Sequence, residues 1–182
     1  MNAARKINIS VQTVALITAG ILLVPFLIMQ FTNEVNWSLF DFLIMGGIIF
    51  CSGLALRYFV NQSDQLAYRI GIALAIGTTF LLIWANLAVG LIASGANTAN
   101  LMYIGVIGIG ITGAFMTRLA AKGAERTMYA IVLGLVLHTI IALGIGAHKL
   151  PGSSPMEIFM VNGFFIFLYL CAALAFRVRK ND

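Results

Sequence analysis

Charged residues are scarce in this sequence, since Asp, Glu, Lys and Arg make up only 9% of its 182 residues. A soluble domain usually carries about 25% charged residues. Hydrophobic residues make up 61% of the chain and its mean hydropathy is +1.00, so it could not cover a surface that faces water. The composition therefore predicts a membrane protein, with a single transmembrane domain covering residues 1–182.

Cysteine and histidine are also rare, which limits the metal and cofactor sites that the chain could build. Cys51 and Cys171 lie deep in apolar runs, where we expect them to act as small hydrophobic side chains. His138 and His148 fall on one expected helix, so they could not bind the two faces of one haem. A zinc site needs three or four ligands. We therefore expect no cofactor and no metal.

Long apolar runs are what the sequence does contain. About 20 apolar residues are needed for a helix to cross the hydrocarbon core. Six segments qualify: 11–31, 37–59, 67–93, 100–120, 128–147 and 156–176. These runs lack the alternation typical of membrane β-barrels, and helices satisfy their own backbone groups in lipid. The sequence predicts an all-α bundle of six transmembrane helices, the first a retained span containing Pro25 rather than a signal peptide.

The distribution of Lys and Arg predicts the orientation of these spans. With the N-terminus inside, only Lys149 falls on the outer side. The other ten fall on the cytoplasmic side: Arg5, Lys6, Arg57, Arg69, Arg118, Lys122, Arg126, Arg177, Arg179 and Lys180. We therefore expect both termini in the cytoplasm. Because the basic residues cluster at span ends, the net charge of +5 indicates no nucleic acid partner.

An internal repeat of two-helix hairpins is one interpretation of the even-numbered spans. The segment Cys51-Ser52-Gly53-Leu54-Ala55-Leu56-Arg57 resembles Cys171-Ala172-Ala173-Leu174-Ala175-Phe176-Arg177. Repeated hairpins in the same orientation would be related by an axis along the membrane normal. Chance matching is the alternative, since runs of Leu, Ala and Gly resemble one another and the orientation already requires an Arg at these ends.

The fifth span carries the clearest signal for an interior face. Small residues and one histidine recur every four residues, at Ala130, Gly134, His138, Ala142 and Gly146. This spacing places them on one helix face, where small residues allow a neighbouring helix to approach. We expect His138 to lie at mid-depth and to point into the bundle, with Thr79 and Thr112 as candidate partners. It could serve as a proton or ion relay, or it could make a structural hydrogen bond between helices.

Two asparagines extend this candidate polar interior. Asn86 and Asn162 lie inside the third and sixth spans, near the outer boundary. Together with His138 they outline a polar path that opens outward, and the same three residues could equally hold helices together.

The two acidic residues near the outer helix ends fit capping better than catalysis. Ser38 precedes Asp41 by three residues, and Ser154 precedes Glu157 by the same spacing. Both pairs match the capping box, in which a hydroxyl caps free amides and the acid favours the positive end of the helix. Pro155 at the first helical position supports this interpretation.

The segment from residue 84 to residue 103 is the most distinctive. It contains Trp84-Ala85-Asn86-Leu87-Ala88-Val89-Gly90 and then Asn97-Thr98-Ala99-Asn100-Leu101-Met102-Tyr103. This pattern resembles a signature of an uncharacterised family of small polytopic bacterial inner-membrane proteins, which implies an inner-membrane location and no particular activity. The residues themselves predict Trp84 and Tyr103 in the interfacial aromatic belt and Asn100 as a helix N-cap.

Two classes of function fit these features, and an enzyme is not one of them, because the sequence contains no nucleotide-binding loop or catalytic triad. The first is an accessory or structural subunit that packs against a larger membrane complex or against itself, for which Gly163, Phe164, Phe165 and Phe167 could supply a lateral surface. The alternative is a small-molecule or ion transporter or channel with a polar path through His138 and Asn86. Apart from such proteins, the lipid bilayer is the expected partner.

Overall fold

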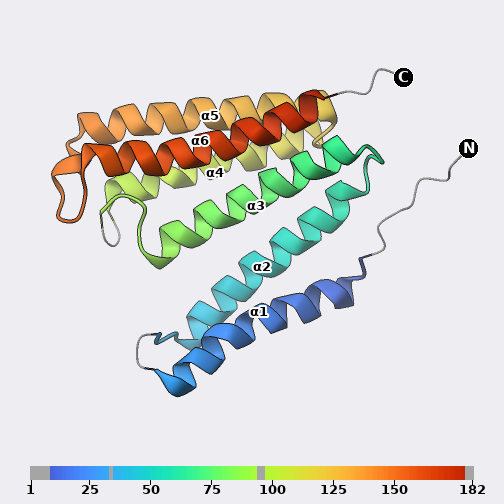
Figure 1. The fold of residues 1–182 in the computed structure, drawn as a ribbon, viewed down its shortest axis with the longest axis horizontal. Coiled ribbons are helices and arrows are strands. Elements are labelled where there is room, and N and C mark those ends of the chain that lie inside the picture. The colour runs from blue at the N-terminus through green and yellow to red at the C-terminus, as the bar shows by residue number, and fades with distance from the viewer. Residues whose placement is uncertain (1–8, 33–34, 94–96, 179–182) are drawn as a thin grey trace, which may run out of the picture. The chain divides into compact units, whose positions relative to one another are not determined.

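The computed structural model describes residues 9–32, 35–93 and 97–178, and within them the chain forms six α-helices and one short 3₁₀ helix (Figure 1). The helices are α1 (Val11–Phe31), α2 (Leu39–Val60), α3 (Leu66–Ala88), α4 (Thr98–Thr117), α5 (Ala121–Gly144), η1 (Ala147–Lys149) and α6 (Pro155–Arg177). All six α-helices are long and apolar enough to cross a membrane. The prediction of an all-α chain with six such helices is confirmed. Arg5, Lys6, Arg179 and Lys180 lie outside the described residues.

Two helix ends predicted from the apolar runs are wrong. The third run was expected to extend to residue 93, but α3 ends at Ala88, and Gly90 follows with a left-handed φ of 74°. The fifth run was expected to start at residue 128, but α5 starts at Ala121, one residue beyond the left-handed pair Arg118 and Leu119. The charged segment 121–127 is thus helical, because a helix can continue beyond the residues that its apolar run contains.

The predicted capping of the acidic residues is confirmed in full for α2 and in part for α6. Ser38 N–H donates to Asp41 Oδ2 at 2.7 Å, and Asp41 N–H donates to Ser38 Oγ at 3.3 Å, which completes the capping box. At α6, Glu157 N–H donates to Ser154 Oγ at 3.1 Å, with Pro155 in the first turn. Within the described residues, the Glu157 side chain makes no return bond to Ser154.

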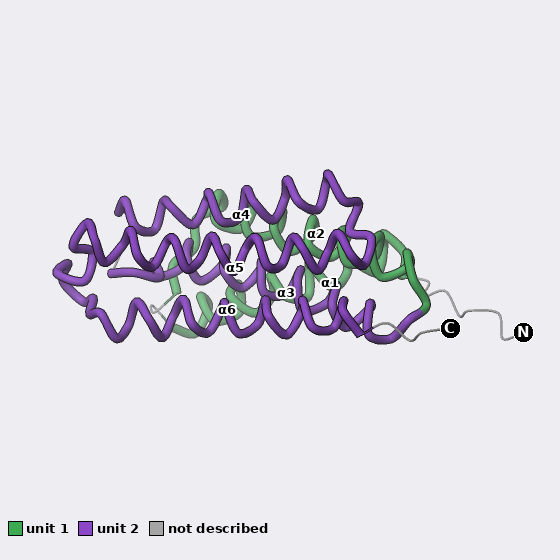
Figure 2. Tube along the Cα trace, turned by 90° about the horizontal axis from the view of Figure 1, so that it is seen from above, with its two compact units in different colours: residues 1–64 green, residues 65–182 purple. Residues whose placement is uncertain are grey.

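The chain divides into two compact units, residues 1–64 and residues 65–182, which Figure 2 shows in different colours. The first unit contains α1 and α2, which pack along one another. A Cβ atom on Gly53 would lie 2.6 Å from Val14 Cγ1, so this glycine allows the two helices to approach closely. The single domain expected from the sequence stays a prediction, and so does the hairpin repeat.

The second unit contains α3 to α6 and the best-buried residues of the chain. The central helix α5 packs against α4 and α6, and α3 packs against the other side of α6. One buried line of α5 consists of Ala124, Met128, Ile131, Leu135, His138 and Ala142. At the start of α3, Tyr68 donates its hydroxyl to the carbonyl of Leu119 at 3.0 Å, which holds α3 to the turn between α4 and α5.

Candidate functional site

His138 lies on the buried face of α5, with 3% of its surface exposed. Its Nε2 atom is 2.9 Å from the carbonyl oxygen of Ala99, in the first turn of α4. A carbonyl can only accept, so Nε2 carries the hydrogen and Nδ1 of the neutral ring is an acceptor. The prediction that His138 points into the bundle is confirmed. The predicted mid-depth position in the membrane stays a prediction; within α5, which starts earlier than expected, His138 lies nearer the C-terminal end.

Tyr103 connects His138 to Asn162. The Tyr103 ring lies against the His138 ring with centroids 4.1 Å apart, and its hydroxyl donates to Asn162 Oδ1 at 2.9 Å. Tyr103 is fully buried and Asn162 is 1% exposed. The prediction of Tyr103 in an interfacial aromatic belt is therefore wrong, because its hydroxyl finds a partner inside the bundle. Trp84, the other residue expected in that belt, is 42% exposed.

Three polar atoms of this region are buried without a hydrogen-bond partner among the described residues: His138 Nδ1, Asn162 Nδ2 and Asn86 Oδ1. The His138 and Asn162 side chains are neighbours, and their unused atoms have complementary roles, since an amide nitrogen donates and this ring nitrogen accepts.

Asn100 organises the connection between α3 and α4. Its Oδ1 accepts the backbone N–H groups of Leu91 at 3.1 Å and Ile92 at 2.9 Å, and its Nδ2 donates to the Ile92 carbonyl at 3.1 Å. Asn97 is the N-cap of α4 and accepts the Asn100 N–H at 3.0 Å. The prediction of Asn100 as the N-cap is wrong, because the helix starts one turn earlier and the Asn100 side chain binds the loop instead.

Asn86 reaches the same place from α3. Its Nδ2 donates to the Asn100 carbonyl at 3.1 Å, one residue after the carbonyl that His138 contacts. The three residues of the predicted polar path, Asn86, His138 and Asn162, therefore gather around the first two turns of α4. We call them the α4 polar cluster, together with Asn100 and Tyr103.

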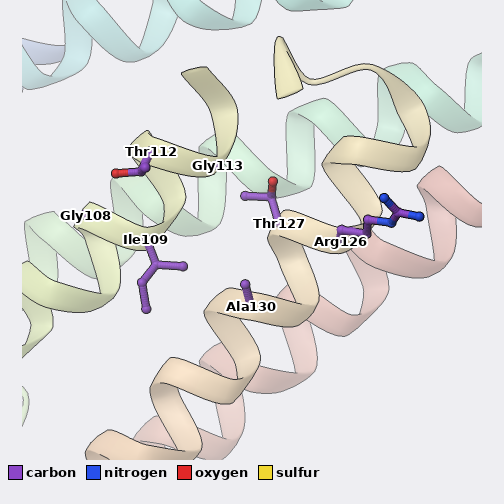
Figure 3. Close-up of a pocket in the computed structure, with 7 residues that line it drawn as sticks. All are labelled: Gly108, Ile109, Thr112, Gly113, Arg126, Thr127 and Ala130. Carbon is purple, nitrogen blue, oxygen red and sulfur yellow. The ribbon is translucent and has the colours of Figure 1, made fainter. Parts of the chain in front are cut away.

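The two threonines expected as partners of His138 lie elsewhere, so that prediction is wrong for both. Thr79 donates its hydroxyl to the Ala75 carbonyl at 2.8 Å and is 2.9 Å from the Tyr169 hydroxyl, on the α3–α6 side of the unit. Thr112 is exposed and lines a groove between α4 and α5 (Figure 3).

The small-residue strip of α5 is interior in its central part only. Ala142 is fully buried, and a Cβ atom on Gly134 would lie 2.8 Å from Ile109 Cδ1 of α4. Ala130 is exposed, and Gly146 lies beyond the end of α5 with a left-handed φ of 77°. The glycine of this strip that allows close approach to α4 is therefore Gly134, one turn before His138.

The sequence also contained a signal for the interior role of the polar residues at the start of α4, which the predictions above did not assign to them. Asn97, Asn100 and Tyr103 follow one another at intervals of three, which places them on one side of α4. A row of polar side chains on an apolar helix needs partners in the bundle.

No protein-family model, no curated protein and no solved structure matches this chain. The family resemblance of the segment 84–103 therefore stays a prediction.

Proposed function

We propose that this chain is an accessory or structural subunit of a membrane assembly, without enzymatic activity of its own. This proposal rests on one observation: the side chains of the α4 polar cluster form most of their hydrogen bonds with backbone groups. His138 contacts the Ala99 carbonyl, Asn86 donates to the Asn100 carbonyl, and the Asn100 side chain binds four backbone groups of the preceding loop. Polar side chains engaged with backbone in this way fix helix ends and loops rather than bind a substrate.

The exposed face of α6 supports contact with another membrane protein. It presents large apolar side chains at helical spacing: Met156, Phe159, Met160, Phe164 and Phe167. Gly163 lies among them, and a Cβ atom there would meet no atom within 4 Å. A small residue flanked by large ones suits the close packing of membrane helices. Phe165, which was expected on this surface, is 3% exposed and belongs to the interior.

The proposed location is a bacterial inner membrane, with both termini in the cytoplasm. The ten-to-one distribution of Lys and Arg supports this orientation. Reporter fusions after Asp182 and within residues 94–99 should report opposite sides of the membrane. A C-terminus on the outer side would overturn the orientation.

A lateral-surface variant tests the accessory role. We expect the full chain, extracted in mild detergent, to co-purify with a second membrane protein or a second copy of itself. Gly163→Leu should abolish this association, because the leucine fills the space that a neighbouring helix would occupy. Gly77→Leu on α3 is the matched control, since a Cβ atom on Gly77 would also meet no atom within 4 Å. A wild-type chain that purifies alone as a monomer would contradict the proposal.

A transporter or channel for ions or small molecules is the second candidate. It is favoured by the buried, unpartnered atoms of His138, Asn162 and Asn86, all close to the start of α4. If these atoms line a path, purified protein in liposomes should give a pH-dependent ion flux that His138→Gln abolishes in a folded chain. An equal flux in wild-type and variant liposomes would exclude this path.

A further inference from the structure

A groove between α4 and α5 is lined by none of the residues of the α4 polar cluster. It has a volume of about 560 Å³. Its lining comes from two helices: Gly108, Ile109, Thr112 and Gly113 of α4, and Arg126, Thr127 and Ala130 of α5 (Figure 3). A Cβ atom on Gly113 would lie 2.5 Å from Thr127 Cγ2, so the two helices touch at the floor of the groove.

The groove is amphipathic along its length. Figure 3 shows Ile109 and Ala130 on its two sides, with Arg126 further along α5 and its guanidinium extending away from them. Gly108 adds open space on the apolar part, because a Cβ atom there would meet nothing within 4 Å. An occupant therefore needs an apolar body and a polar end.

Basic residues gather at the polar end. Arg126 lines the groove, Lys122 lies one turn earlier on α5, and Arg118 ends α4. All three side chains are exposed, and within the described part of the chain none of them has an ion pair or a hydrogen bond. The first turn of α5 also has no side-chain cap. These charges call for an anionic group.

We propose that this groove binds an anionic phospholipid of the surrounding membrane. The phosphate would lie against Arg126 and Lys122, where charge–charge attraction and guanidinium hydrogen bonds favour it. One acyl chain would lie along Ile109, Gly108 and Ala130. Basic pockets between membrane helices suit phosphate headgroups, and a free phosphate would leave the apolar part of the groove uncovered.

Native mass spectrometry of the full chain in mild detergent tests the proposal. The protein is titrated with phosphatidylglycerol, with phosphatidylcholine of the same acyl chains, and with inorganic phosphate. We expect phosphatidylglycerol to bind more tightly than either of the others. Arg126→Gln should weaken its binding about fivefold. Lys149→Gln, which removes one positive charge from the segment after α5, should leave the affinity unchanged.

A second pair of variants tests the acyl-chain part of the groove. Gly108→Leu fills the groove without an internal clash and should weaken phosphatidylglycerol binding. Gly105→Leu is the control, because Gly105 has equally open space on α4 but does not line the groove. Equal binding of the two lipids, equal effects of Arg126→Gln and Lys149→Gln, or equal effects of the two leucine variants would each overturn the proposal. Tight binding of inorganic phosphate alone would show an anion site and not a lipid site.

Discussion

His138 Nε2 and the Ala99 carbonyl oxygen lie 2.9 Å apart and join the C-terminal part of α5 to the first turn of α4. This contact fixes the proton of the neutral ring on Nε2, since a carbonyl has no hydrogen to give. It also explains why a histidine occurs on the small-residue strip of α5: its ring spans the gap to α4 and then supports the Tyr103 ring at 4.1 Å.

The effect of a His138 substitution on the free energy of unfolding should therefore depend on whether the new side chain reaches the Ala99 carbonyl. In His138→Gln the terminal amide can take the place of Nε2, so the free energy of unfolding should stay close to that of the wild type. His138→Asn is shorter and His138→Leu cannot donate, so both should lose about 0.6 kcal/mol, the average for hydrogen bonds between membrane helices, and at most about 1.7 kcal/mol. Unfolding of the purified variants in mixed micelles gives these values.

The order of the three variants decides this interpretation. A structural bond to Ala99 requires Gln to be the most stable replacement. If Leu is as stable as Gln, the bond contributes nothing to folding, and the polar ring at this position would need another explanation.

The sequence was sufficient to predict the helices, because a membrane would leave few alternatives for such apolar runs. An apolar run of about 20 residues without the alternation of a barrel strand is stable in lipid only as a helix. The same reasoning placed His138 in the interior, because an exposed polar ring in lipid is costly. Both predictions follow from the cost of exposing polar groups to lipid, and neither requires knowing which residues are in contact.

The helix ends and the polar partners could not be predicted in this way. Asn97 caps α4, and the side chains of both Asn97 and Asn100 bind the preceding loop, so the residue type alone does not show which asparagine is the cap. Tyr103 suits either the membrane interface or the interior, and only Asn162, which is 59 residues away in the sequence, decides between them. Pairings of this kind depend on how helices pack, which local patterns do not contain.

The two predicted capping boxes should respond differently to substitution. Ser38→Ala removes the hydroxyl that accepts the Asp41 N–H, so it should lower the free energy of unfolding by about 0.5–2 kcal/mol. Asp41→Asn should cost less, because an amide oxygen can still accept the Ser38 N–H. Glu157→Gln should cost least, since the Glu157 side chain makes no capping bond within the described residues. Loss of the protein's activity in a folded Glu157→Gln variant would instead indicate a chemical role for this acid.

Asn100→Ala should be the most damaging substitution in the α4 polar cluster. It leaves the buried N–H groups of Leu91 and Ile92 without their acceptor, and each such group costs about 1–3 kcal/mol. Asn97→Ala removes a helix cap and should cost about 0.5–2 kcal/mol. Hydrogen exchange provides the specific measurement: amides of residues 91 and 92 should lose protection in Asn100→Ala, while amides in the middle of α6 keep theirs. Unchanged protection at residues 91 and 92 would contradict the role of Asn100.

A double-mutant cycle on Tyr103 and Asn162 tests whether the cluster acts as one unit. Tyr103→Phe removes the hydroxyl that donates to Asn162 Oδ1, and Asn162→Leu removes the acceptor together with the unpartnered Nδ2. Because the two residues are in direct contact, the double variant should be more stable than the sum of the single effects predicts, by about 0.5–3 kcal/mol.

Tyr103 and Thr79 provide the matched control cycle. Thr79 bonds to Ala75 and Tyr169, and no hydrogen bond joins it to Tyr103 within the described residues, so Tyr103→Phe and Thr79→Val should be additive. Unfolding free energies in mixed micelles give both cycles. If the two cycles gave the same coupling energy, the hydrogen bond from the Tyr103 hydroxyl to Asn162 would contribute nothing to the free energy of unfolding. A larger coupling for Tyr103 and Asn162 follows from their 2.9 Å hydrogen bond, in a site where neither side chain reaches solvent.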